Sequence, residues 1–247
     1  MTSTVDLNAD MGEGIGNDAA LLDIVTSANI ACGGHAGDVD TMADTMKAAY
    51  GKGVWIGAHP GFFDREGFGR ARQTLSADQL RSLIAYQLGA ALGIGAEIGV
   101  PLRHLKLHGA LANMAAEDIG IARACFAAAR ALAPQIVLMA MAGTQQERAA
   151  RELGGAWVGE VFGDRAYGED GTLLDRSHPS AVLHDATEAA ERIADMVRQS
   201  SIVTLSGKLI PTKIDTICVH GDTPEAVEMA RKIRARLLQM DVAVAPF

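Results

Sequence analysis

Cysteine and long apolar runs are both scarce in this chain. The three cysteines, Cys32, Cys125 and Cys218, are widely spaced and include no CxxC pair, which argues against a disulfide framework and a cysteine zinc knuckle. No uncharged apolar run approaches the length of about 18 residues that a membrane span needs. Residues 1–6 also lack the basic and apolar regions of a signal peptide. These absences predict a cytoplasmic protein with no membrane partner.

Positive charge is also in short supply. The formal net charge is −8 at pH 7, and no cluster of Lys and Arg with interleaved aromatic residues offsets it, so we expect no nucleic-acid partner. The sequence contains neither a GxxxxGK[ST] loop nor a GxSxG elbow, and the glycines of residues 12–16 are not spaced as GxGxxG. Standard nucleotide-binding loops and serine-hydrolase chemistry are therefore disfavoured.

Apolar residues, by contrast, are abundant and regularly placed. A chain of 247 residues with 49% hydrophobic content can bury a full core. Short apolar runs alternate with longer helical patterns, which predicts a mostly parallel sheet covered by helices. The expected strands are residues 5–8, 29–32, 54–59, 104–108, 136–140, 157–162, 202–205 and 216–220.

Helical patterns fill the segments between these runs. The expected helices are residues 18–26, 40–50, 76–98, 119–132, 144–153, 185–199 and 224–240. Seven or eight βα units in a chain of this length favour one single-domain α/β barrel over residues 1–247, with seven or eight mostly parallel strands. An open doubly wound sheet is the alternative, because periodicity does not reveal whether a sheet closes.

Four apolar runs end in the same way, with a histidine and a glycine. The most informative is residues 27–38, which carries His35, and the others end in His59, His108 and His220. In βα barrels and open α/β sheets, ligands bind at the C-terminal ends of the strands, so we expect these histidines to share one site. A single histidine at a strand end is more often structural, whereas four in this setting favour a function.

The first strand leads into two carboxylates, Asp10 and Glu13. Paired carboxylates hold a divalent cation or divide acid and base roles, and helix capping near Asn17 is the structural alternative. Asp10 with His35 and His59 would make an oxygen and nitrogen ligand set suited to a transition metal. No HExxH or HxH spacing supports that set.

Lys106 is the first candidate for a functional cation. It lies two residues before His108, so both side chains face the same side of a regular strand. A lysine on a buried strand is costly unless it is paired or used. Other cations beside the segments rich in Gly and His are Arg65, Arg70, Arg72, Arg165 and Arg176. These residues predict an enzyme that carries out hydrolysis or another polar reaction on a small anionic molecule.

The candidate site residues form two groups. The catalytic candidates are Asp10, Glu13, His35, His59, Lys106, His108 and His220. The candidates for substrate or phosphate binding are Asn8, Asp64, Arg70, Glu160, Asp164, Arg165 and Asp222. The candidate metal ligands Asp10, His35 and His59 belong to the first group.

Seven segments follow one another along the chain in a recognisable order. They are residues 6–14, 27–38, 57–61, 67–70, 106–111, 160–167 and 218–222. Together they resemble the LamB/YcsF family and cover nearly the whole chain. The family pattern has proline where Leu107 stands, tyrosine where Ala112 stands and alanine where Gly163 stands. The absence of the tyrosine removes a stacking or hydroxyl contact with a ligand.

The resemblance implies one subunit of an ATP-dependent 5-oxoprolinase, which cleaves 5-oxo-L-proline to L-glutamate while ATP is hydrolysed to ADP and phosphate. It also implies a βα barrel similar to that of sugar deacetylases, ATP as co-substrate and two other 5-oxoprolinase subunits as partners. A divalent cation, either Mg²⁺ or a transition metal, and a homo-oligomer are compatible with it. The alternatives are a metal-dependent amidohydrolase or deacetylase that acts without ATP, and a non-catalytic sugar- or lactam-binding subunit.

Overall fold

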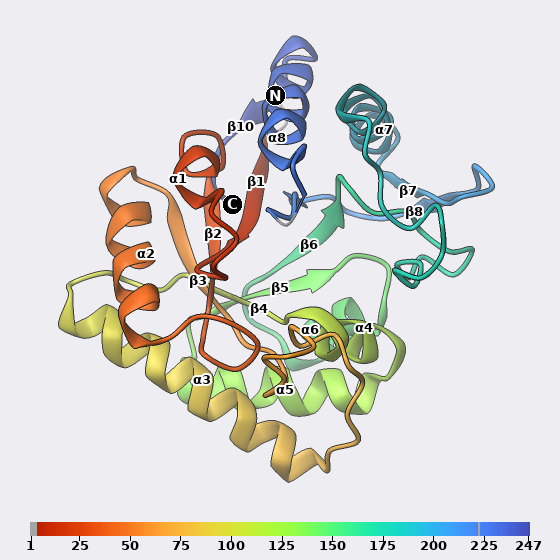
Figure 1. Cartoon of the computed structure of the whole chain (residues 1–247). Helices are drawn as coiled ribbons and strands as arrows, with labels where there is room; N and C mark the ends of the chain where they lie inside the picture. Colours follow the sequence, from red (N-terminus) through yellow and green to blue (C-terminus); the bar gives the residue numbers. More distant parts are fainter. Residues whose placement is uncertain (1–3, 222) are drawn as a thin grey trace.

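Seven parallel strands form a closed barrel in this computed structural model, which describes residues 4–221 and 223–247 (Figure 1). The strands are β1 (Thr4–Met11), β2 (Ser27–Ala31), β3 (Trp55–His59), β4 (His104–Lys106), β5 (Val137–Met141), β6 (Trp157–Phe162) and β9 (Thr216–Cys218). Consecutive strands are neighbours from β1 to β6, and β9 pairs with both β6 and β1, which closes the ring. The predicted α/β barrel is therefore confirmed.

Helices cover the outside of this barrel (Figure 1). They are α1 (Asp18–Leu21), α2 (Val39–Gly51), α3 (Ala77–Glu97), α4 (Gly109–Glu117), α5 (Ile119–Leu132), α6 (Gln145–Leu153), α7 (Ala186–Gln199) and α8 (Ala226–Gln239). Capping side chains in the sequence fix several starts. Asp38 accepts a hydrogen bond from the Thr41 amide at the start of α2, and Ser76 and Gln79 form a reciprocal capping box at the start of α3.

The prediction of an eighth barrel strand at residues 202–205 was wrong. That segment falls in β7 (Ser201–Val203), which pairs with β8 (Leu209–Pro211) in a separate antiparallel hairpin. A parallel neighbour needs a crossover of about a dozen residues or more. The polar turn Ser206-Gly207-Lys208 instead reverses the chain, and too few residues remain before β9 for a helix. A last short strand, β10 (Ala243–Val244), pairs with the start of β1.

Two boundaries near the predicted site also differ from expectation, as does the end of one helix. β1 extends to Met11, because its last residues pair with β2, so Asp10 lies within the strand. β4 ends at Lys106, and His108 becomes the N-cap of α4, a helix that the periodicity did not predict. The predicted helix over residues 18–26 ends earlier, at Leu21.

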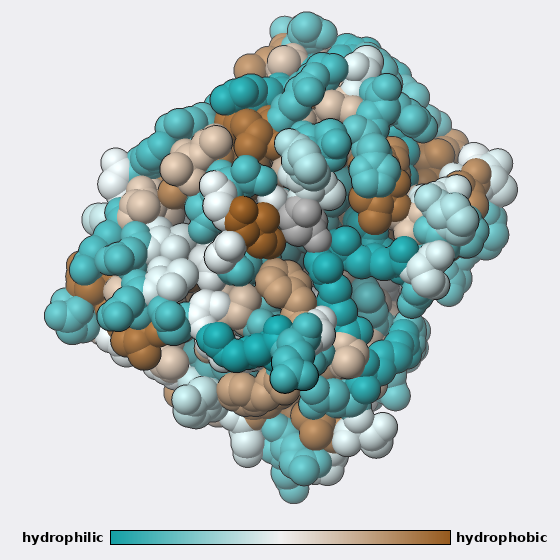
Figure 2. Space-filling model, viewed as in Figure 1, coloured by the Kyte–Doolittle hydropathy of each residue, from teal (hydrophilic) through white to brown (hydrophobic). Residues whose placement is uncertain are grey.

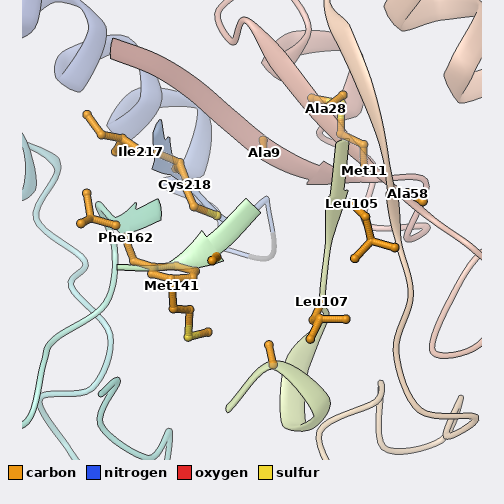
Figure 3. Packing of buried hydrophobic residues seen from close by; sticks show 14 of the residues in the cluster. Ala9, Met11, Ala28, Ala58, Leu105, Leu107, Met141, Phe162, Ile217 and Cys218 are labelled. Atoms are coloured by element: carbon orange, nitrogen blue, oxygen red, sulfur yellow. The ribbon is translucent and has the colours of Figure 1, made fainter. Parts of the chain in front are cut away.

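The interior of the barrel is polar, although most βα barrels are filled with branched apolar side chains. Along β1, Ala9 and Met11 belong to the buried apolar cluster, part of which Figure 3 shows, while Asn8 and Asp10 alternate with them and face inward. Other strands add further buried polar residues to the interior: Asn29, His104, Lys106, Glu160 and Thr216. Such groups must satisfy one another, since each unpaired buried group costs free energy.

The hydropathy of the surface bears on the absence of membrane-spanning segments predicted from the sequence. The face shown in Figure 2 is mainly hydrophilic, with hydrophobic residues in small separated groups. No helix among the described residues has both the length and the apolar character needed to cross a bilayer. All three cysteines are buried and free, as their spacing predicts.

Gly57 on β3 faces the ring of His104 on β4, and this contact tests the packing of the polar interior. A Cβ atom at Gly57 would lie 2.2 Å from Cδ2 of His104. We expect Gly57→Ala to lower the free energy of unfolding by about 1–3 kcal/mol, the usual cost of overpacking, in urea denaturation. The control is Gly93→Ala within α3, where a Cβ meets nothing within 4 Å. That variant should be unchanged or more stable, by about 0.5–1 kcal/mol. Equal stability of the two variants would contradict the prediction.

Candidate functional site

Residues from the C-terminal ends of the barrel strands gather around one cavity of about 210 Å³. Five of the catalytic candidates line it: Asp10, His59, Lys106, His108 and His220. The other two, Glu13 and His35, lie behind the histidines, since Glu13 Oε1 is 2.9 Å from His35 Nε2 and 3.5 Å from His108 Nδ1. The structure therefore brings all seven together.

Lys106 occupies the centre of the cluster and is buried. Its Nζ lies 2.8 Å from Asp10 Oδ1, 3.0 Å from Glu160 Oε1 and 3.0 Å from Cys218 Sγ. Burial alone would lower the pKa of Lys106, but the charge of Asp10 and further acidic groups raises it well above its ordinary value. The ammonium group therefore stays protonated and holds the two carboxylates in place.

A hydrogen-bonded chain below Lys106 orients Asp10. Asn29 Nδ2 donates to Asp10 Oδ1 and to Asn8 Oδ1, both at 2.8 Å, and its Oδ1 accepts from His104 Nε2 at 2.7 Å. Burial and then the charge of Lys106 lower the pKa of His104 to about 3, so this imidazole is neutral. Sequence reasoning missed Asn29 and His104 as part of the site. The two-residue spacing between His104 and Lys106 was the available signal, because it places both on the inner face.

Backbone carbonyls fix the tautomers of two histidines. His59 Nδ1 donates to the carbonyl oxygen of Lys106 at 3.0 Å, and His108 Nε2 donates to that of Phe68 at 2.8 Å. Each ring thus turns its other nitrogen inward, and His59 Nε2 lies 3.0 Å from His108 Nδ1. Two lone pairs at this distance repel each other unless a proton or a cation lies between them.

Glycines permit the close packing of these rings. The rings of His35 and His108 stack with centroids 3.5 Å apart and an interplanar angle of 4°. A Cβ at Gly61 would lie 2.9 Å from His35 Nδ1, and one at Gly69 would lie 2.7 Å from His35 Cβ. Both loops therefore need glycine to approach His35, and Gly69 also has a positive φ of 65°.

The histidine cluster fits a transition metal by its donor chemistry. Ligand atoms of Glu13, His35, His59 and His108 all lie within 4.8 Å of one another. Burial, followed by the charge of His59, lowers the pKa of His35 to about 2, and burial also lowers that of His108. These rings are therefore neutral, as metal ligands must be, and His35 Nδ1 is buried without a hydrogen-bond partner among the described residues. This cluster shares His35 and His59 with the predicted set of Asp10, His35 and His59 and adds Glu13 and His108, whereas Asp10 belongs to a neighbouring donor set.

A second donor set, made of Asp10, Cys218 and His220, lies next to the first. Here the ammonium group of Lys106 already lies within 3.0 Å of both Asp10 Oδ1 and Cys218 Sγ. Positive charge is therefore supplied by the protein itself at this position. The histidine cluster is the better candidate for a bound metal ion.

His220 and Asp164 form a hydrogen-bonded pair at the wall of the cavity. His220 Nδ1 lies 2.7 Å from Asp164 Oδ2, and the ring stacks on Phe162. Burial would raise the pKa of Asp164, but the interaction with His220 lowers it, so the carboxylate is ionised. An ionised Asp164 holds the proton on Nδ1 and leaves His220 Nε2 toward the cavity, 3.9 Å from Asp10 Oδ2. This arrangement suits proton transfer.

The remaining candidates for ligand binding are distributed unevenly. Arg70 and Arg165 line the cavity, as does Arg176. Asn8 and Glu160 contact each other below Lys106, where Asn8 Nδ2 is 3.2 Å from Glu160 Oε1. Asp64 lies outside the cavity lining, because its carboxylate accepts hydrogen bonds from the amides of Gly67 and Ala71 in a surface turn. Asp222 lies outside the described residues.

Comparisons with known proteins agree on one family. Residues 5–247 match the model of the LamB/YcsF family. The chain is 56% identical to a Ruegeria pomeroyi protein named as a 5-oxoprolinase subunit, over 98% of each chain. It is also similar to the solved structure of a lactam utilization protein from Thermus thermophilus, with a TM-score of 0.90 and 39% identity over 99% of this chain and 100% of that chain. A T48 deacetylase with substrate has a TM-score of 0.52 at 16% identity, over 99% of this chain and 88% of that chain, which shows the fold alone.

Lys106→Met tests the role of the buried ammonium group. The substitution leaves Asp10 and Glu160 without their shared cation, so we expect the free energy of unfolding at pH 7 to fall by about 3–5 kcal/mol. Burial would raise the pKa of Asp10, but His59 and Lys106 hold it well below its ordinary value. The wild-type ion pair therefore stabilises the fold above the ordinary carboxyl pKa, and this stabilisation is lost as pH falls through the lowered pKa.

In the variant, the buried carboxylates keep their protons to a higher pH, so its deficit relative to wild type should shrink between about pH 7 and about pH 5. Urea denaturation at both pH values measures the difference. Lys47→Met, at an exposed lysine of α2, is the control and should change stability by less than about 0.5 kcal/mol. An equal deficit at both pH values would rule out the ion-pair explanation.

Proposed function

Since the chain belongs to the LamB/YcsF family, we propose that it is one subunit of an ATP-dependent 5-oxoprolinase. The reaction opens 5-oxo-L-proline to L-glutamate and is coupled to hydrolysis of ATP to ADP and phosphate. The observation that carries this proposal is the convergence of the His59–Asp10–Lys106 cluster and the His220–Asp164 pair on one small cavity. The name of the relative from Ruegeria pomeroyi supports the choice of substrate.

The chemistry explains why ATP is needed. A five-membered lactam is stabilised by amide resonance and is a poor electrophile. Phosphorylation of its amide oxygen would create a better electrophile and couple ring opening to hydrolysis. The site would then meet developing negative charge, which fixed cations and hydrogen-bond donors stabilise. ATP is therefore proposed as co-substrate, with 5-oxoproline as substrate and two other 5-oxoprolinase subunits as partners.

Residues of this chain can be given roles on geometric grounds. His220 would transfer a proton to or from the reacting lactam through Nε2, while Asp164 keeps the ring oriented. Lys106 would hold Asp10 ionised and in position. Asn8 and Glu160, below Lys106, would act by positioning it rather than by touching substrate.

The histidine cluster would hold a divalent cation in the same cavity. Glu13, His35, His59 and His108 would be its ligands, with Asp10 beside them, since Asp10 Oδ2 is 3.2 Å from His59 Nε2. When bound, such an ion supplies Lewis-acid polarisation of a carbonyl oxygen. The other steps do not depend on it in this proposal.

The same cluster favours a second candidate function, a metal-dependent amidohydrolase or deacetylase that acts without ATP. Neutral histidines and a carboxylate beside a small cavity are what such an enzyme requires. The two candidates differ in their need for ATP and for partner chains. A non-catalytic subunit that binds a sugar or a lactam would show neither activity.

The first test is a coupled assay for glutamate and ADP with 5-oxo-L-proline and ATP. We expect both products when this chain is combined with the two other subunits, and little or no turnover by this chain alone. Within the complex, His220→Asn should lower turnover by about 10²–10⁴-fold, the usual contribution of general acid–base catalysis. His184→Asn, at an exposed histidine, should leave turnover unchanged.

Two other outcomes of this assay would support one of the alternative functions. Ring opening by the isolated chain without ATP would replace the proposal with the amidohydrolase alternative. Binding of 5-oxoproline without turnover in the complete complex, unchanged in His220→Asn, would support the non-catalytic subunit.

Metal binding is a separate prediction. We expect calorimetric titration of the metal-free chain with Zn²⁺ to reveal about one strong site per chain. His59→Ala should weaken binding by at least about 10²-fold, since even outer partners of metal ligands cost about 10–100-fold when removed. His184→Ala should bind as wild type. Equal affinities of the His59→Ala and His184→Ala variants would exclude the histidine cluster as the metal site.

A further inference from the structure

The mouth of the cavity is lined by Arg70, Asp175 and Arg176, which are exposed or partly exposed, and the buried Arg165 lines the cavity beside them. At the floor, the charges of Asp10 and Lys106 are paired at 2.8 Å. Three arginines, Arg70, Arg165 and Arg176, thus line one cavity. In a chain with a net charge of −8, three guanidinium groups gathered at one cavity are compatible with an anionic ligand.

Arg165 is the best defined of these arginines, because it is 4% exposed and still lines the cavity. Its Nε donates to the carbonyl oxygen of Ala181 at 3.1 Å, and its Nη2 donates to that of Leu174 at 2.5 Å. Arg192 donates to the backbone carbonyls of Phe162 and Arg165, which fixes the segment that carries the side chain. The guanidinium group is thus held rigidly before any ligand arrives.

The hydrogen bonds of Arg165 leave one edge of the guanidinium group available. A guanidinium group has five N–H donors, and the two bonds to carbonyl oxygens use the Nε–H and one N–H of Nη2. The donors left over are both N–H groups of Nη1 and one N–H of Nη2. A parallel pair therefore remains on the edge formed by Nη1 and Nη2 if the bond to Leu174 uses the N–H of Nη2 that lies beside Nε. This edge matches a carboxylate, which accepts two parallel hydrogen bonds from arginine.

Electrostatics near Arg165 also favour an incoming anion. Burial, followed by the positive charge of Arg176, lowers the pKa of Arg165, and the charge of Asp164 acts in the opposite direction. The neighbouring carboxylate of Asp164 is engaged with His220 at 2.7 Å. Asp175, at the mouth, accepts hydrogen bonds from the amide and hydroxyl of Ser177.

We propose that Arg165 binds the carboxylate of the substrate and makes the site selective for lactams that carry a carboxylate beside the ring nitrogen. This inference rests on the proposed function. 5-Oxoproline has its scissile carbonyl on one side of the ring nitrogen and its carboxylate on the other. A cavity of about 210 Å³, below the range of about 300–1,000 Å³ for drug-sized ligands, can hold both ends of so small a molecule at once.

The test measures calorimetric binding of 5-oxo-L-proline and of 2-pyrrolidinone, the same lactam without the carboxylate, to the full-length chain. We expect Arg165→Met to weaken 5-oxoproline binding by about 30-fold or more, as expected when one partner of a buried charge pair is removed. 2-Pyrrolidinone should bind weakly and equally to wild type and variant. Arg165→Lys keeps the positive charge but loses the paired N–H donors of the guanidinium group. Its affinity for 5-oxoproline should lie between those of wild type and Arg165→Met.

Two further variants guard against a folding artefact. Arg165→Gln retains N–H donors for the carbonyls of Ala181 and Leu174 but removes the charge, and it should lose 5-oxoproline affinity with a melting temperature near that of wild type. Arg130→Met removes an arginine that also donates to backbone carbonyls, those of Pro134 and Ala156, away from the cavity. It should bind both ligands as wild type does.

Failure of this inference and failure of the proposed function can be told apart. Equal weakening of 5-oxoproline and 2-pyrrolidinone by Arg165→Gln, in a complex that still produces glutamate, would overturn the carboxylate site and leave the function standing. Binding of L-proline that depends on Arg165, in a complex that never opens 5-oxoproline, would support the carboxylate site without the function. Competition by inorganic phosphate that is lost in Arg165→Met, with no effect of L-proline, would make this a phosphate site and overturn the proposal.

Discussion

The site depends on one buried ion pair, between the ammonium group of Lys106 and the carboxylates of Asp10 and Glu160. An interior of this polarity is costly unless every charge is compensated. Lys106 compensates the charge of Asp10 from the end of β4 and also contacts Glu160, whose pKa is raised by burial. The side-chain amides of Asn29 and Asn8 donate further hydrogen bonds to Asp10 and Glu160. The polar interior of the barrel is therefore one connected network that fixes Asp10 at the floor of the cavity.

Above this network, the histidine cluster and the arginines occupy different parts of the site. Burial lowers the pKa values of His35 and His108, and backbone carbonyls of Lys106 and Phe68 set the orientation of the rings of His59 and His108. The arginines stand apart at the mouth of the cavity. Neutral donor nitrogens at one end and fixed cations at the other suit a small molecule with a reactive carbonyl and a separate negative charge.

The sequence predicted the barrel because strands and helices alternate, and predicted the histidine site because each histidine follows an apolar run beside glycine. It failed at residues 202–205, where an apolar run forms a hairpin, because composition does not show which strands become neighbours. Asn29 and His104 were missed since each reads as part of a buried strand, and their role follows only from contacts across the barrel. The acidic partners of Lys106 come from β1 and β6, and the sequence alone does not show that these strands bring them to Lys106.

Glu13 belongs to the histidine cluster and is also influenced by the charge of Asp10. Burial and then the negative charge of Asp10 raise the pKa of Glu13 to about 7, so this carboxyl group, 2.9 Å from His35 Nε2, is partly protonated near neutral pH. A divalent cation would occupy the same atoms and displace that proton, because both satisfy the repulsion between the lone pairs of His59 and His108. In the proposed metal site, proton and cation would compete for one position, and the affinity of the cluster for a cation would rise with pH as Glu13 ionises.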